Sequence, residues 1–231
     1  MKRDELLAFQ ERVIHALSGE KPADGIDPAR IGLVRDLAKA KRIAKVESVL
    51  PRTCRALGDD FRRLSDDFAR GTPPTSFRSR ADGLAFYRFL GRRRAAPALL
   101  DLAYCELAVS AIATRSSRDH SGSFRSVSSD IAIRRAPRVR LRICQFDVRA
   151  FFEDDGTAIP AAIPRSPIHL AILADPLAGT PRILQLTPGL FDFVRALRAP
   201  RVLPAVTDED TRQLLDDLEQ WGLVEIVRAG E

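Results

Sequence analysis

The sequence contains only three cysteines, and they lie far apart at Cys54, Cys105 and Cys144. An odd number of widely spaced cysteines argues against a disulfide framework and is typical of reduced thiols. No apolar run approaches the roughly 20 residues that a membrane helix needs. The charged stretch at residues 1–5 is unlike a secretory signal peptide. We therefore expect a cytoplasmic protein with no membrane partner.

Motifs of common enzymes are also missing. The sequence has no glycine-rich phosphate loop, no nucleophile elbow and no Cys/His spacing of a metal site. Acidic pairs such as Asp59–Asp60 fall at neighbouring helical positions, which point about 100° apart. We therefore expect no catalytic residue, metal or cofactor in this chain. A site assembled around Cys54 or Cys105 is the enzymatic alternative.

Lysine is scarce, so arginine supplies most of the positive charge. The 231 residues include 37 basic and 31 acidic ones, which gives a net charge of +6, and only five of the basic residues are lysines. The pI is about 9.7. Guanidinium groups bind phosphates and carboxylates alike. The charge therefore fits either a nucleic acid or an acidic protein as partner.

Residues 1–116 have the periodicity of helices. Apolar side chains recur at helical spacing, for example at Ile31 and Val34, and Asp27–Pro28 has the composition of a helix start. We predict a helical bundle that serves as a partner-docking domain. The Ser- and Arg-rich stretch that follows has no apolar period, and we predict a linker over 117–137.

The periodicity of strands begins at residue 138. Val139, Leu141 and Ile143 alternate with arginines, and residues 168–173 and 182–186 have the pattern of a hairpin. Two amphipathic helices and a closing strand follow. The overall prediction is an α+β fold, in which residues 138–231 form a small, winged-helix-like domain after the bundle.

A hairpin followed by two helices offers a site for an extended peptide. An exposed strand edge can accept the peptide as an added strand, while pockets on a neighbouring helix select its side chains. The candidate peptide-binding residues are Arg182, Leu184, Leu186, Arg212, Leu215 and Glu219. The alternative is that this strand and this helix simply pack against each other.

Two arginine clusters are candidate docking surfaces for an acidic protein. Their members are Arg92, Arg93, Arg94, Arg138, Arg140 and Arg142. The first cluster can instead complement a helix dipole. The second can instead guard a sheet edge against aggregation.

Residues 31–113 resemble the HvfC/BufC family, whose domain is labelled DNA-binding. The resemblance rests on the order and spacing of short segments at residues 49–51, 57–61, 68–70, 72–76, 89–90 and 101–108. The longest of them reads Asp101-Leu102-Ala103-Tyr104-Cys105-Glu106-Leu107-Ala108.

Residues 168–227 resemble the peptide-recognition element of PqqD-like proteins. The matching segments are residues 182–187, 190–194 and 214–224. In that family a β-hairpin and helices bind the leader of a ribosomally made precursor peptide. The resemblance implies a shortened middle helix over residues 199–206.

Together these resemblances imply a role. The layout is similar to that of the MbnC and TglI partner subunits of MbnB- and TglH-like enzymes. In such pairs a TIM-barrel enzyme holds several irons and oxidises a cysteine of the precursor peptide. The small subunit presents the leader. The implied partners are therefore an iron enzyme and a leader peptide, with the iron held by the enzyme and not by this chain.

A DNA-binding transcriptional regulator is the alternative function. The basic pI and the winged-helix-like order favour it. However, the second helix of the C-terminal part carries many acidic residues, including Asp210, Asp216 and Asp217. Phosphates repel such a helix, which makes it a poor reader of the major groove. We therefore expect that nucleic acid is not a partner.

Overall fold

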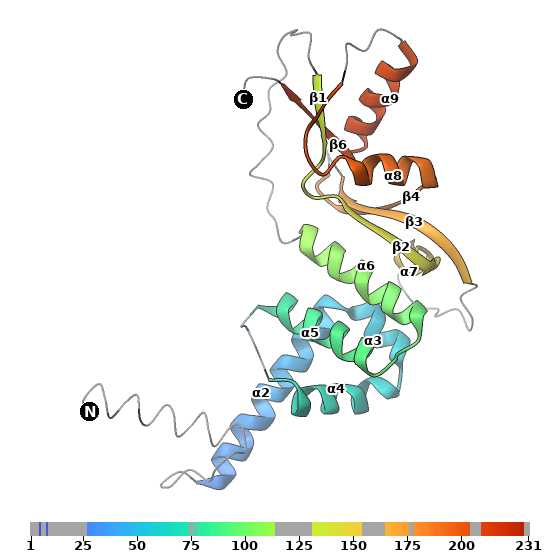
Figure 1. Ribbon diagram of the computed structural model, residues 1–231. Coiled ribbons are helices and arrows are strands. Elements are labelled where there is room, and N and C mark those ends of the chain that lie inside the picture. The colour runs from blue at the N-terminus through green and yellow to red at the C-terminus, as the bar shows by residue number, and fades with distance from the viewer. Residues whose placement is uncertain are drawn as a thin grey trace.

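The computed structural model describes residues 5, 8, 27–73, 76, 78–113, 131–153, 165–175, 178–203 and 209–228. A helical region comes first, and two small antiparallel sheets with accompanying helices follow (Figure 1). The fold is α+β, as predicted. Within the described residues, no helix is both long and apolar enough to cross a bilayer.

Within the described residues, five helices form the N-terminal bundle. They are α2 (Pro28–Val49), α3 (Pro51–Leu57), α4 (Asp60–Gly71), α5 (Ser79–Arg92) and α6 (Pro97–Ala113). The Asp27 carboxylate caps α2 by accepting from the Ala29 N–H at 2.9 Å. Gly58 ends α3 with φ of 54°, a conformation that glycine adopts without a steric penalty. The start of α2 lies where the sequence predicts it.

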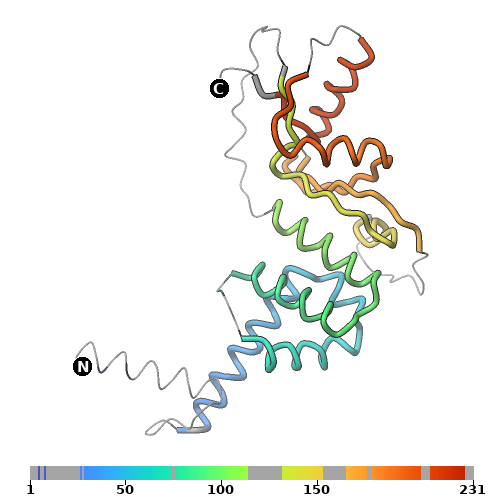
Figure 2. The backbone as a smooth tube through the Cα atoms, viewed as in Figure 1, coloured from blue at the N-terminus to red at the C-terminus, as the bar shows by residue number. Residues whose placement is uncertain are grey.

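The first half of α2 extends away from the bundle (Figure 2). Its apolar stripe is exposed, with 71% of Leu33, 48% of Val34 and 54% of Leu37 accessible. Further along the helix, Val46, Val49 and the following Leu50 are buried in the bundle core. Only the second half of α2 is therefore anchored by tertiary packing among the described residues.

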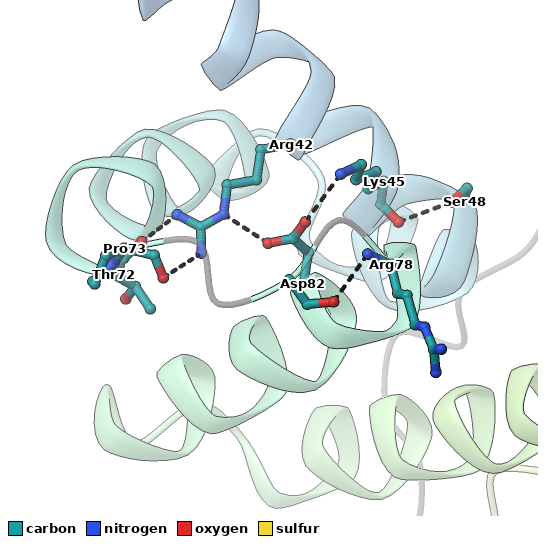
Figure 3. A network of polar contacts seen from close by, with 8 residues as sticks. Arg42, Lys45, Ser48, Thr72, Pro73, Arg78 and Asp82 are labelled. Atoms are coloured by element: carbon teal, nitrogen blue, oxygen red, sulfur yellow. Dashed lines mark hydrogen bonds and ion pairs between the residues drawn. The ribbon is translucent and has the colours of Figure 1, made fainter. Parts of the chain in front are cut away.

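A buried ion pair joins α2 to α5 (Figure 3). Arg42 Nε donates to Asp82 Oδ1 at 2.8 Å, and both side chains are more than nine-tenths buried. The same guanidinium donates to the carbonyls of Thr72 and Pro73 and lies 4.2 Å from the centre of the Phe68 ring. Arg42 thereby ties the end of α4 to α2 and α5.

In the described part of the strand region, the strands form two three-stranded antiparallel sheets. One has the order β2–β3–β4, and the other has the order β5–β1–β6. The strands are β1 (Ile131–Arg135), β2 (Arg140–Phe146), β3 (Arg165–Ala174), β4 (Pro181–Leu186), β5 (Arg201–Leu203) and β6 (Val224–Arg228). The remaining helices are α7 (Ala150–Glu153), α8 (Pro188–Ala196) and α9 (Glu209–Gln220).

The β2–β3–β4 sheet is buried on both faces. Ile168, Leu170 and Ile172 of β3 belong to one core cluster with residues of α6. The intervening Ala171 and Leu173 belong to another cluster with residues of α8 and α9. Successive side chains of a strand point to opposite faces, so α6 covers one face and α8 the other. In Figure 1 the sheet accordingly lies between α6 and α8.

Helix α6 is shared by the bundle and this sheet. Ala103 and Leu107 pack in the bundle core, whereas Leu102 and Cys105 pack under the sheet. An apolar sequence around its whole circumference is what burial on two sides requires. The helix therefore fixes the sheet relative to the bundle.

Two local predictions need correction. Strand β1 lies within the range predicted as linker, whose residues 117–130 fall outside the described part. Strand β5 occupies part of the range where the resemblance implies a shortened helix. After β2, residues 150–153 form the short helix α7, and Val148 and Phe151 pack in the cluster with α6.

Candidate functional site

The predicted peptide-binding residues of β4 face α8. Leu186 is buried, and Leu184 packs against the same core cluster. Arg182 Nη1 bonds the carboxylate of Asp175 across the hairpin at 3.0 Å. This face of the strand is therefore mostly filled by the protein's own core.

The predicted helix residues are also accounted for within the fold. Leu215 is buried in the same cluster as Leu186. Arg212 is exposed and bonds Glu209, one turn earlier in α9, at 2.8 Å. Glu219 is half-buried. For the leucines, the alternative that the strand and helix elements pack into one core describes the structure.

The outer edge of β4 presents main-chain groups that do not bond β3. Strand β4 pairs with β3 and is the last strand of its sheet in the described structure. The Asp175 N–H donates to the Thr180 carbonyl at 2.7 Å, which makes residues 175 and 180 a hydrogen-bonded pair. Such pairs alternate along an antiparallel ladder, so the even-numbered residues of β4 bond β3. Ile183 and Gln185 consequently direct their N–H and C=O groups outward.

Beside this edge lies a cavity of about 290 Å³. It is lined by Arg52, Val109, Arg149, Phe152, Pro181 and Ile183. The lining comes from α3, α6, the start of α7 and the start of β4, so it is assembled from four separate parts of the chain. It opens on the α6 side of the sheet, because Ile183 packs in the α6 cluster.

The two arginines of this pocket are held in different ways. The guanidinium carbon of Arg52 lies 4.7 Å from the centre of the Phe152 ring, and Arg52 Nε donates to the Phe151 carbonyl. Arg149 makes a forked contact with Asp147, at 2.9 and 2.6 Å. The hydrogen bond from the Arg149 side chain lowers the pKa of the Asp147 carboxyl group. Both guanidiniums are thus positioned before any ligand arrives.

Glu106 fixes the helix start that carries Arg52. Its carboxylate accepts from the main-chain N–H groups of Arg52 and Thr53 at 2.7 and 2.8 Å. Burial raises the pKa of this carboxyl group, although the Thr53 hydroxyl and these N–H groups lower it in part. On balance the pKa of Glu106 is raised.

The predicted docking arginines do not form one surface of equivalent side chains. Arg142 reaches the buried Asp101 of α6 at 3.5 Å and lies 4.6 Å from the centre of the Tyr104 ring. It therefore helps to join the sheet to α6. Arg140 contacts the Pro137 carbonyl at 3.4 Å, and Arg138 is half-buried.

The triplet at the end of α5 is exposed. Arg93 bonds Asp67 of α4 at 3.2 Å and lies over the Phe89 ring, whereas Arg92 and Arg94 extend along the surface. Arg94 has a positive φ of 55°, just beyond the helix end. The triplet stays a candidate docking surface, with Arg93 partly used inside the fold.

The cysteines are buried and poorly suited to nucleophilic chemistry. Burial, with a smaller contribution from the neighbouring Glu106, raises the pKa of the Cys54 thiol to about 12. A hydrogen bond with the Cys144 thiol, followed by burial, raises the pKa of the Cys105 thiol. A thiol reacts as its thiolate, so these environments disfavour attack. In the part of the chain that is described, no three His, Cys, Asp or Glu side chains cluster as metal ligands would.

Comparison with known protein families finds a match for part of the chain. Residues 7–92 match the family described as SCO6045-like, C-terminal domain. The match spans α2 to α5 and ends before α6 and the sheets. No curated protein matches the chain. The β4 edge and its pocket therefore lie outside the matched segment.

The sequence predicts the strand but not the pocket. Arg52, Arg149 and Phe152 are separated in sequence and come together only through α3, α6 and α7. One local signal was present: Pro51 marks a helix start, which places Arg52 in a first turn. Nothing in the sequence pairs that turn with β4.

Proposed function

We propose that this chain is a non-catalytic partner subunit that binds the leader of a ribosomally made precursor peptide. It would present that peptide to an MbnB/TglH-like, TIM-barrel enzyme with several irons, which modifies a peptide cysteine. One observation carries the proposal: the outward N–H and C=O groups of Ile183 and Gln185 at the edge of β4.

Strand addition is the mode of binding that this edge supports. A peptide strand laid beside β4 would exchange main-chain hydrogen bonds with Ile183 and Gln185. Each such bond contributes about 0.5–1.5 kcal/mol net. Pro181, at the start of the strand, has no N–H to donate, so the ladder would be strongest over the second half of β4. Edge strands without other protection readily accept such pairing.

The buried leucines have a supporting role in this proposal. Leu184, Leu186 and Leu215 hold β4, α8 and α9 together as one core. A rigid edge loses little conformational entropy when a peptide docks on it. These side chains would therefore hold the edge in position without touching the peptide.

Docking of the enzyme is assigned to arginines that reach the surface. Arg92 and Arg94 are exposed at the end of α5, and the half-buried Arg140 lies on β2. An acidic surface on the enzyme would be steered toward them, and the attraction would weaken with added salt. The irons and the oxidation chemistry belong to the enzyme in this proposal.

Co-purification from the native host tests the assignment. The tagged chain is isolated, and the accompanying proteins, peptides and metals are identified. The proposal expects an iron-containing enzyme in near-equal amount, which is lost at high salt and reduced by charge reversal of Arg92 and Arg94. Recovery of the chain with duplex DNA and no enzyme would contradict the proposal and favour a DNA-binding regulator.

A further inference from the structure

We propose that the pocket beside Ile183 binds an acidic side chain of the peptide that pairs with β4. This inference rests on the proposed function, because it requires a strand at the β4 edge. It adds a chemical requirement that the main-chain ladder does not impose: one Asp or Glu at a defined position of the peptide.

The register of an added strand leads to the pocket. Residues directly opposite each other on paired strands have their side chains on the same face of the sheet. Ile183 faces α6 and lines the pocket. A peptide residue opposite Ile183 would lie one strand spacing away, about 4.8 Å, and on the same face. Its side chain would therefore reach the pocket, while its neighbours in sequence would point to the α8 side.

The lining of the pocket selects a carboxylate. Arg52 and Arg149 contribute two guanidiniums, and none of the six lining residues is acidic. Asp147, through its contact with Arg149, and Glu106, near Arg52, offset part of this positive charge. A guanidinium binds a carboxylate through charge-assisted hydrogen bonds, which are stronger than neutral ones. An apolar wall of Val109, Phe152 and Ile183 would strengthen that interaction by excluding water.

The size of the pocket suits a single side chain. Sites for drug-sized ligands span about 300–1,000 Å³. The volume here, about 290 Å³, lies at the lower edge of that range. A pocket of this size and charge beside a strand edge has the properties of a specificity pocket in strand addition.

Peptide selection on the full-length chain tests the inference. Short random peptides displayed in a library are selected on the wild-type chain and then synthesised. Peptides that depend on the β4 edge are recognised by weaker binding to Gln185→Pro but not to Gln185→Ala. In these peptides each Asp or Glu is then changed to its amide, and binding is measured to the wild type, to Arg149→Gln and to Arg195→Gln. Arg195 lies on α8, on the other side of the sheet, and is the matched control.

The inference expects one acidic position at which the amide lowers affinity by about tenfold or more, since a charge-assisted hydrogen bond contributes about 1.5–3 kcal/mol. Arg149→Gln should lower the affinity for the acidic peptide by a similar factor and leave the affinity for the amide peptide unchanged. Arg195→Gln should change neither affinity. Edge-dependent peptides without such a position would overturn the inference and leave the proposed function standing. If no selected peptide depends on the edge, the proposed function fails and the inference fails with it.

Discussion

The main-chain N–H of Arg52 donates to the carboxylate of Glu106 at 2.7 Å. The same carboxylate accepts hydrogen bonds from the Thr53 N–H at 2.8 Å and from the Thr53 hydroxyl at 2.7 Å. The first N–H groups of a helix have no partner within the helix. Glu106 of α6 therefore completes the start of α3 and fixes the turn from which Arg52 enters the pocket.

Replacing Glu106 by alanine should destabilise the fold strongly. The change leaves the part-buried Arg52 N–H, the buried Thr53 N–H and the Thr53 hydroxyl without their acceptor. We expect the free energy of unfolding to fall by about 3 kcal/mol or more, as measured by urea denaturation. Glu106→Gln keeps one carbonyl acceptor, so its free energy of unfolding should fall less than that of Glu106→Ala. Equal stability of Glu106→Ala and the wild type would show that this carboxylate does not hold α3.

The raised pKa of Glu106 predicts how stability changes with pH. Burial places the pKa of this group in the folded state above its ordinary value of 4.5. The folded state then holds the proton more strongly than the unfolded state, so this contribution to stability is lost as the pH rises through the folded-state pKa. Compared with Glu106→Gln, the wild type should lose stability as the pH rises from about 4.5 upward. A difference that grows in the opposite direction would contradict the assignment.

The ion pair of Arg42 and Asp82 should behave as a coupled unit. Asp82→Ala leaves a buried guanidinium with only its carbonyl partners, and we expect a loss of about 3–5 kcal/mol. The double variant Arg42→Met/Asp82→Ala should lose less than the two single changes added together. Thermal and urea unfolding of all four proteins measure this coupling. Strict additivity would mean that the two side chains do not interact.

The cysteines should resist alkylation in the folded protein. Cys54, Cys105 and Cys144 are buried, and the pKa values of the Cys54 and Cys105 thiols are raised. Iodoacetamide at pH 8 should therefore modify them slowly in buffer and quickly in denaturant, as followed by mass spectrometry. Rapid modification of Cys54 or Cys105 in the folded chain would revive the alternative of an enzyme that uses one of these thiols.

Local signals predicted most of the elements. Asp27–Pro28 marks a helix start whose side-chain cap is formed in the structure. The alternation around Leu184 predicted β4, because a strand's period depends only on neighbouring residues. Short elements such as β1, β5 and α7 escaped detection, since three to five residues carry too little pattern to reveal a period.

The sequence predicts only part of the site, because the important features depend on which strands and helices pack together and in which register. The sequence placed Arg182, Leu184 and Leu186 on one face of β4 but did not reveal that this face packs under α8. Which main-chain groups point outward follows from the register with β3. The pocket requires the contact between α3, α7 and β4, which no periodicity encodes.

The most direct test of the account is the effect of proline on the two sides of β4. Gln185 is exposed, and its N–H points outward, so Gln185→Pro should leave the fold intact. The same change should lower the affinity for a selected peptide about tenfold or more. Gln185→Ala is the control. Leu184→Pro removes a bond to β3 and should unfold the sheet. Methylation of alternate main-chain nitrogens of the peptide, which leaves the protein unchanged, should weaken binding in the same way. Full affinity of the peptide for a folded Gln185→Pro variant, or for the methylated peptides, would contradict strand addition at β4.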